Sequence, residues 1–165
     1  MKAIIIRGAG NKGKSTTIRE VCKRLKPQGV YKLDISKKEK VEEDIDKICN
    51  DIYLIEVNGK YILVFAGSPT EISVNVSVAV DICIKIGIEI SFAIVSRKYA
   101  ERKYTERKVK FDTRKELKEK GFEVIHEELV RKIEQNNFEQ TEEWNERINN
   151  IVDKVNKELN KRYEK

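Results

Sequence analysis

The pattern of apolar and polar positions in the first part of the chain predicts a strand, then a helix, then a second strand. Residues 3–7 form a short, mostly apolar run that is typical of a buried strand. Residues 15–25 carry apolar side chains three and four positions apart, which predicts an amphipathic helix that ends before Pro27 and Gly29. Residues 30–34 predict a second strand. This order is typical of an α/β fold.

The next part of the chain predicts a charged segment followed by a hairpin. Residues 37–51 are charged and place their apolar side chains at helical spacing. Within residues 52–67, Asn58-Gly59 separates two β-rich runs, which is the strongest short signal for a β-hairpin. The second run, 61–66, is apolar throughout, as expected of a strand buried on both faces.

Residues 72–94 fit two periodicities at once. Every even position is Ile or Val except Phe92, which favours a strand, whereas four polar residues recur every fourth position, which favours a helix; these are Ser73, Ser77, Asp81 and Lys85. Parallel strands at 61–66 and 88–95 need a crossover, and crossovers are usually helical. We therefore predict a helix over 70–86 that ends at Gly87, and an all-β structure is the alternative.

The last third of the chain is predicted to be mostly helical. Residues 112–120 predict a charged helix closed by Gly121, residues 122–126 a last strand, and residues 127–135 another helix. A long C-terminal helix is predicted over about 138–163. Its apolar stripe consists of Trp144, Ile148, Ile151, Val152, Val155 and Leu159. We expect this stripe to pack in the core or to form a homodimer surface.

Together these elements predict one α/β domain over residues 1–165. The expected fold is a three-layer sandwich with a mainly parallel sheet, one antiparallel hairpin strand and a long C-terminal helix. The composition, with 39% hydrophobic and 38% charged residues, is typical of a soluble protein. No apolar run reaches the ~20 residues of a membrane span, and no signal peptide is recognisable, so we expect a cytoplasmic protein. The three cysteines have no metal-binding spacing and are expected to be reduced.

The loop between the first strand and the first helix carries candidate chemistry. Its sequence, GAGNKGKS, fits the pattern G-x-x-x-x-G-K-[ST] at every defined position. Glycines there allow backbone N–H groups and the positive end of the following helix to point at an anion. The predicted phosphate-binding residues are Gly8, Ala9, Gly10, Asn11, Lys12, Gly13, Lys14, Ser15 and Thr16. In this geometry Lys14 reaches the β- and γ-phosphates, and the Ser15 hydroxyl is a ligand of Mg²⁺.

On this motif the chain resembles the P-loop NTPase superfamily, with the specific part of the resemblance covering residues 3–25. The resemblance implies a parallel α/β sheet with a nucleotide at the carboxyl ends of the strands. GTPases of this superfamily have an aspartate–glycine switch motif and an N-K-x-D motif, and this chain has neither. We therefore expect ATP rather than GTP, together with Mg²⁺. Partition ATPases carry a lysine directly after the first glycine, where this chain has Ala9.

The acidic residue that the superfamily usually has at the end of an apolar strand is missing, because residues 61–66 are followed by Gly67-Ser68. Asp34, at the end of the second predicted strand, is our candidate for a catalytic carboxylate and a ligand of Mg²⁺. Small P-loop kinases often carry an Asp at the corresponding place. A turn-capping role is the alternative for Asp34. Glu71 is the next candidate, with a structural role in the first turn of a helix as its alternative.

Residues 97–120 contain eleven Lys or Arg and five Asp or Glu, which accounts for the whole net charge of +6. Arg97, Arg102 and Arg107 recur five positions apart, with Tyr99 and Tyr104 between them. The position resembles the arginine-bearing lid of small P-loop kinases, so Arg97 is our candidate for stabilising a transferred phosphoryl group. A solvated surface is the alternative, and basic residues interleaved with tyrosine also suit nucleic acid, which we do not favour.

The sequence thus predicts an ATP-binding P-loop protein that either hydrolyses ATP or transfers its γ-phosphate to an unidentified acceptor, as a kinase does. A non-catalytic nucleotide-dependent binding or sensor module is one alternative. A nucleic-acid-associated ATPase or polynucleotide kinase is another. His126, at the end of the last predicted strand, is a candidate contact for the base, and a partly buried structural histidine is the alternative.

Overall fold

The computed structural model describes residues 1–8, 13–98, 101, 111–130 and 141–161. The strands are β1 (Lys2–Gly8), β2 (Gly29–Asp34), β3 (Glu39–Glu42), β4 (Ile52–Val57), β5 (Lys60–Phe65), β6 (Ile90–Lys98) and β7 (Glu123–Leu129). The helices are α1 (Lys14–Arg24), α2 (Pro69–Ile72), α3 (Val76–Lys85), α4 (Thr113–Glu119) and α5 (Glu142–Leu159), with a 3₁₀ turn, η1, at Ile45–Lys47. The strands form a seven-stranded sheet in the order β3-β2-β4-β5-β6-β1-β7.

The sheet is mixed, so the prediction of a mainly parallel sheet with one antiparallel strand is wrong. Among the described strands, the neighbours β5-β6, β6-β1 and β1-β7 are parallel, whereas β3-β2, β2-β4 and β4-β5 are antiparallel. Two of the antiparallel pairs, β2-β3 and β4-β5, follow from short connections, because a turn of a few residues can join only antiparallel neighbours. Residues 35–38 join β2 to β3, and Asn58-Gly59 joins β4 to β5.

Several predicted elements are confirmed close to their expected bounds. β1, α1, β2, β6 and α4 lie where the pattern placed them. The hairpin at Asn58-Gly59 is also confirmed, and both turn residues have positive φ, at 52° and 76°. Two central residues with positive φ are what a type I′ hairpin turn requires, and Asn-Gly adopts that turn readily.

The segment predicted as a helix over 70–86 is helical, which excludes the all-β alternative there. It consists of two helices, because Ser73 at the end of α2 adopts a left-handed conformation with φ 61°. The Ser68 side chain caps α2 by accepting a hydrogen bond from the Glu71 N–H. Gly87, with φ 79°, follows the end of α3, as expected of a helix terminator.

One helical spacing pattern does not form a helix, and one predicted helix is wrong at its start. The helical spacing in residues 37–51 does not form an α-helix, because residues 39–42 pair with β2 as the edge strand β3 and only η1 is helical. Residues 127–129, where we expected a helix to begin, continue β7, because they pair with β1. The rest of that predicted helix, from residue 131 on, lies outside the described residues.

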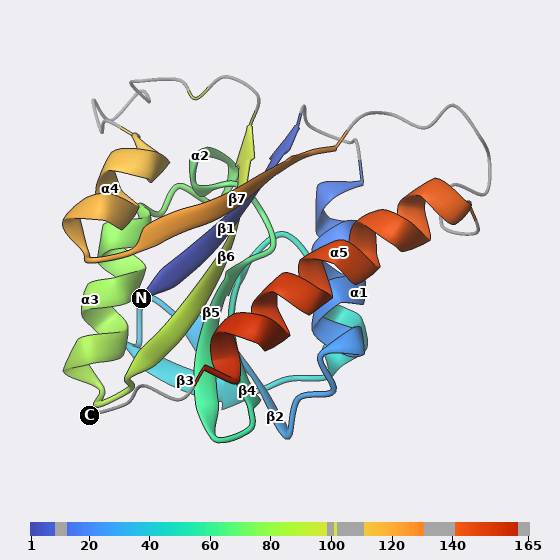
Figure 1. The fold of residues 1–165 in the computed structure, drawn as a ribbon. Coiled ribbons are helices and arrows are strands. Elements are labelled where there is room, and N and C mark those ends of the chain that lie inside the picture. The colour runs from blue at the N-terminus through green and yellow to red at the C-terminus, as the bar shows by residue number, and fades with distance from the viewer. Residues whose placement is uncertain (9–12, 99–100, 102–110, 131–140, 162–165) are drawn as a thin grey trace.

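Helices cover both faces of the sheet (Figure 1). On one face, α1 and α5 pack on Ile4 and Ile6 of β1. On the other face, α3 and α4 pack on Ala3 and Ile5 of the same strand. Such alternation is the expected period of two in a strand that is buried on both faces.

The apolar stripe of α5 is buried in the first of these cores, where its six side chains are at most 8% exposed. The chain itself therefore covers the surface that we considered for a homodimer contact. The predicted helix bounds extend beyond α5 at both ends, and residues 138–140 and 162–163 lie outside the described residues. Among the described residues, none of the helices is both long and apolar enough to cross a membrane.

Candidate functional site

The candidate site begins where β1 turns into α1. β1 ends at Gly8, and α1 starts at Lys14 after Gly13, whose φ of 81° lies in the left-handed region that glycine tolerates best. Gly8 is also closely approached, since a Cβ there would lie 2.9 Å from the carbonyl oxygen of Val130. The predicted phosphate-binding residues Ala9, Gly10, Asn11 and Lys12 lie outside the described residues. The strand and the helix that the motif requires are both present.

The side chain of Lys14 is buried, at 6% exposed, and its ammonium group points back towards the end of β1. Its Nζ donates a hydrogen bond to the carbonyl oxygen of Gly8 at 3.0 Å. Burial lowers the pKa of the Lys14 amine below its ordinary value, although the nearby Glu71 carboxylate acts in the opposite direction. A desolvated ammonium that lies beside a helix N-terminus is favourable for binding an anion.

Ser15 and Thr16 lie in the first turn of α1. The Ser15 hydroxyl donates a hydrogen bond of 2.7 Å to the carbonyl oxygen of Ala66, directly after β5. This contact places the Ser15 hydroxyl at the carboxyl edge of the parallel strands, where α/β sheets commonly bind ligands. Thr16 is partly exposed beside it.

A carboxylate and a second lysine complete this edge of the sheet. Glu71 Oε1 lies 3.9 Å from Lys14 Nζ and 4.0 Å from Lys98 Nζ. Lys98 is the last residue of β6 and lies opposite Gly8 in the parallel β1–β6 register. We ranked Glu71 second on sequence and did not consider Lys98. Its position at the end of a strand, within the basic segment, is the signal that could have identified it.

Asp34 is not brought together with Lys14. It ends β2, which runs in the same direction as β1, but β4, β5 and β6 lie between these two strands. At about 4.8 Å per strand, four spacings correspond to about 19 Å. Asp34 accepts hydrogen bonds from the backbone N–H of Lys37 and the Ser36 hydroxyl, both at 2.9 Å, and these lower the pKa of its carboxyl group. Asp34 therefore stabilises the turn after β2.

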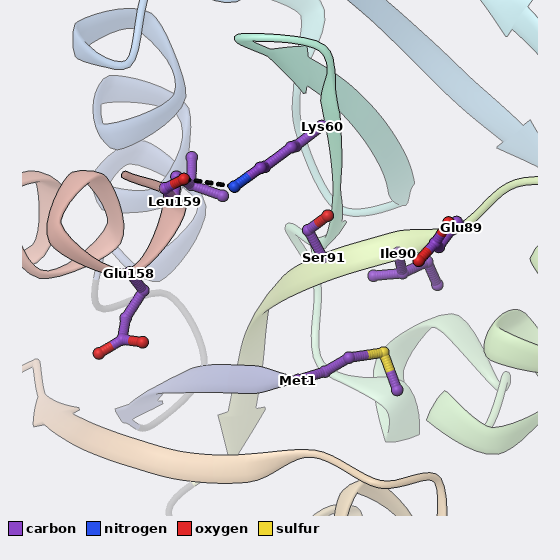
Figure 2. A pocket seen from close by; sticks show the side chains of 7 residues that line it. All are labelled: Met1, Lys60, Glu89, Ile90, Ser91, Glu158 and Leu159. Atoms are coloured by element: carbon purple, nitrogen blue, oxygen red, sulfur yellow. Dashed lines mark hydrogen bonds between the residues drawn. The ribbon is translucent and has the colours of Figure 1, made fainter. Parts of the chain in front are cut away.

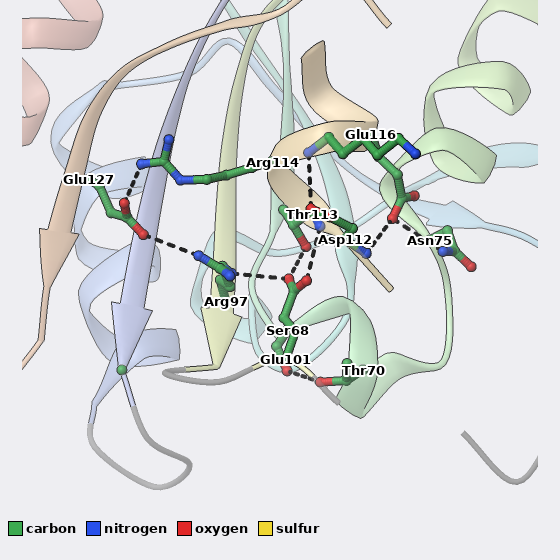
Figure 3. A network of polar contacts seen from close by, with 12 residues as sticks. Ser68, Thr70, Asn75, Arg97, Glu101, Asp112, Thr113, Arg114, Glu116 and Glu127 are labelled. Carbon is green, nitrogen blue, oxygen red and sulfur yellow. Dashed lines mark hydrogen bonds and ion pairs between the residues drawn. The ribbon is translucent and has the colours of Figure 1, made fainter. Parts of the chain in front are cut away.

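Arg97 lies in a network of charged side chains at the same edge (Figure 3). Its guanidinium is 3.3 Å from a carboxylate oxygen of Glu101 and 3.6 Å from one of Glu127. Glu101, at 4% exposed, also accepts hydrogen bonds from the N–H and hydroxyl of Thr113, and Glu127 also pairs with Arg114. Two carboxylates thus compensate the charge that we expected to act on a phosphoryl group. Arg102, Arg107, Tyr99 and Tyr104 lie outside the described residues.

His126 lies within β7 and is engaged by a neighbouring carboxylate. Its Nε2 is 2.8 Å from Glu128 Oε2, and Glu128 also pairs with Arg147 of α5 at 3.4 Å. The His126 side chain is 24% exposed. This arrangement fits the partly buried structural histidine that we gave as the alternative to a base contact.

The oxygen atoms at the site suit Mg²⁺, which prefers hard oxygen ligands and keeps several waters. Two candidate oxygens are the Ser15 hydroxyl, on the residue after Lys14 in α1, and the Glu71 carboxylate, 3.9 Å from Lys14 Nζ. Within the described part of the chain, no group of three or more His, Cys, Asp or Glu side chains forms a metal site. A magnesium ion here would therefore depend on phosphate oxygens of a bound nucleotide as well as on Ser15.

A cavity lies at the edge of the sheet opposite the Lys14 site (Figure 2). It has a volume of about 420 Å³ and is lined by Met1, Lys60, Glu89, Ile90, Ser91, Glu158 and Leu159. Met1 precedes β1 and Ile90 begins β6, so this cavity is at the amino ends of the strands. Lys60 donates a hydrogen bond to the carbonyl oxygen of Leu159 across it. The cavity is therefore separate from the residues around Lys14.

Around Lys14, the carboxyl edge thus brings together Lys14, Glu71 and Lys98, and Ser15 follows Lys14 in α1. These residues supply two cations, one carboxylate and one hydroxyl. This set is suited to binding a phosphate chain with a divalent cation. No family model, no curated protein and no solved structure matches the chain.

Proposed function

We propose that the chain is a P-loop protein that binds ATP with Mg²⁺ between β1 and α1 and cleaves or transfers the γ-phosphate. The observation that carries this proposal is the buried Lys14 ammonium, which follows a left-handed Gly13 at the first position of α1. It lies in a strand–loop–helix whose sequence is GAGNKGKS. The nearest carboxylate oxygen, on Glu71, lies 3.9 Å from the ammonium, which is longer than a hydrogen bond, so a phosphate would supply a closer anionic partner for this buried cation.

The topology around the loop supports the proposal. β1 lies between β6 and β7, and both neighbours are parallel to it, so three carboxyl strand ends meet beside the loop. In open α/β sheets, ligands bind at this edge. The fold would thus be P-loop NTPase-like in its parallel half, with β2, β3 and β4, which are joined by antiparallel pairing, as an extension.

Each residue at the site would have a separate role in binding MgATP. Lys14 would bind the terminal phosphates, and Lys98, from the neighbouring strand end, would add a second positive charge. Ser15 would exchange its hydrogen bond to Ala66 for a place among the ligands of Mg²⁺. The magnesium ion supplies charge neutralisation on the phosphate oxygens, which is its usual role in phosphoryl transfer.

Binding and turnover are tested separately with the whole chain. Calorimetry with ATP and with GTP, each with and without Mg²⁺, measures affinity and base preference. The fate of the label in γ-labelled ATP is then followed with the protein alone and with pooled nucleosides, sugars and 5′-hydroxyl oligonucleotides. Free phosphate indicates an ATPase, a labelled acceptor indicates a kinase, and a labelled oligonucleotide indicates the polynucleotide kinase. Binding without turnover indicates the sensor module.

The substitution Lys14→Met tests the central residue. It removes charge-assisted hydrogen bonds that contribute about 1.5–3 kcal/mol, so we expect about 10- to 150-fold weaker MgATP binding. The melting temperature should stay the same or rise, because a desolvated amine is replaced by an apolar chain of similar length.

Lys23→Met on the same helix is the matched control, since Lys23 is partly exposed and pairs with Asp46. It should leave the affinity unchanged. Equal MgATP affinity of the wild type and Lys14→Met would contradict the proposed role of Lys14.

A further inference from the structure

We infer that Glu71 accepts the proton of the nucleophile that attacks the γ-phosphate, an inference that rests on the proposed function. The strand that precedes α2 ends without an acidic residue, since Ala66, Gly67 and Ser68 follow β5. The chain therefore needs a carboxylate from elsewhere if it is to activate a water or an acceptor hydroxyl. Glu71 is the described carboxylate that pairs with Lys14.

The backbone holds Glu71 firmly at this edge. α2 begins at Pro69, four residues after the end of β5. The N–H of Glu71 donates to the carbonyl oxygen of Ser68 at 3.0 Å and contacts its hydroxyl at 3.4 Å, and Ser68 is itself buried. Ala66 lies in the segment that joins β5 to α2, and its carbonyl oxygen accepts the hydrogen bond of the Ser15 hydroxyl. This bond connects α1 to the segment that carries Glu71.

The side chain of Glu71 is less constrained than its backbone. It is 29% exposed, and its separations of 3.9 and 4.0 Å from the two lysines are longer than hydrogen bonds. The contacts are therefore Coulombic, and they hold the carboxylate between the two ammonium groups. When a phosphate chain engages Lys14 and Lys98, the carboxylate loses these counter-charges and lies beside the terminal phosphate, where a water can reach it.

The other carboxylates near this edge have different partners. Glu101 and Glu127 are paired with Arg97, and Glu101 also holds Thr113. Asp34 caps its own turn and lies four strands from β1. None of these three contacts Lys14, so Glu71 takes the role that we first considered for Asp34.

The proposed reaction is a displacement at the γ-phosphorus in which ADP leaves. The oxygen of a water or an acceptor hydroxyl forms a bond to the γ-phosphorus, and the bond from that phosphorus to the bridging β–γ oxygen breaks. The bond electrons pass to the β-phosphate of ADP. The proton of the nucleophile passes to the Glu71 carboxylate and then to solvent. Lys14 and Lys98 offset the negative charge on the phosphate oxygens.

Glu71→Gln tests this role because it keeps the shape of the side chain and removes its basicity. We expect MgATP affinity by calorimetry to stay within about threefold, because the lysines and the loop remain. Turnover of γ-labelled ATP, as phosphate release or transfer to the pooled acceptors, should fall by at least about 100-fold, the usual loss for a general base. Glu71→Asp, which keeps a shorter carboxylate, should retain an intermediate rate.

Glu119→Gln is the matched control, since Glu119 is an exposed carboxylate whose partner is Lys115 on the same helix, and its turnover should equal that of the wild type. Wild-type turnover in Glu71→Gln would overturn the inference and leave the proposed function standing. Parallel losses of affinity and melting temperature, with normal turnover at saturating ATP, would assign Glu71 a structural role and also overturn it. Absence of ATP binding by the wild type would overturn the proposed function itself.

Discussion

Lys14 and the buried cysteines show how burial changes the chemistry of individual side chains. For Lys14, burial opposes the charged form and lowers the pKa of the amine. A nearby anion would offset this cost by stabilising the ammonium form. For Cys22 and Cys83, burial opposes the thiolate and raises the pKa of each thiol to about 12. Cys49 is exposed by contrast. The same physical cause thus favours anion binding at one residue and suppresses reactivity at two others.

Alkylation with iodoacetamide at pH 8 should therefore distinguish the three cysteines. The thiolate is the reactive form, so Cys49 should be labelled quickly and Cys22 and Cys83 only after unfolding. In the folded protein Cys22 and Cys83 keep their protons, whereas the same thiols in the unfolded chain lose them near pH 9.0. The free energy of unfolding should therefore fall as pH rises from about 9 towards 12. Mass spectrometry of native and denatured samples measures the labelling. Rapid modification of Cys83 in the native protein would contradict the structure.

Secondary-structure elements formed as predicted where a local signal was specific, as in the hairpin of β4 and β5. Asn58-Gly59 adopts positive φ at both positions, and only residues that tolerate that conformation permit a two-residue turn. By contrast, the helical spacing in residues 37–51 was misleading. Ile48 is buried because it packs in the core beside α1, not because the segment is a helix. A short apolar pattern does not separate these two causes.

Gly59→Ala tests the hairpin turn. Gly59 has φ 76° and no atom within 4 Å of the position that a Cβ would take, so the substitution adds backbone strain without a clash. We expect the free energy of unfolding to fall by about 1–2 kcal/mol, the usual cost of a left-handed alanine. Urea denaturation measures it. Asn58→Gly, which keeps the freedom to adopt positive φ, is the control, and equal stability of both variants would refute the assigned turn.

At the level of the whole molecule, α5 joins distant parts of the chain into one core. Its six apolar side chains pack with α1 and with one face of the sheet. Arg24 of α1 adds hydrogen bonds to Asn145 and Asn149 of α5 at 2.7 and 2.9 Å. Because α1 also carries Lys14 and Ser15, the packing of α5 supports the helix on which the candidate site depends.

Ile151→Ala should consequently destabilise the whole fold. Ile151 is fully buried, and truncation of such a side chain usually costs about 2–5 kcal/mol. Ile84→Ala is the control, because Ile84 is 65% exposed and its truncation should change stability by less than about 0.5 kcal/mol. Thermal and urea denaturation compare the two variants. Similar effects of both substitutions would mean that the α5 stripe is not in the core.

The local features of this protein could be predicted from the sequence because each depends on neighbouring residues. Backbone freedom at Gly13, the apolar spacing of α1 and the turn at Asn58-Gly59 act over a few positions. The loop that begins the candidate site, with Lys14 and Ser15 directly after it, follows from the same short-range physics. The structure has both flanking elements that this motif requires.

The composition of the candidate site was decided only by the tertiary structure. Glu71 meets Lys14 and Lys98 because β6 lies between β1 and β5, and no local pattern encodes that order. The same order places Asp34 four strands away, although it also ends a strand. Whether a strand end lies at the site depends on pairing between segments far apart in the chain, and side-chain charges become partners only after that pairing.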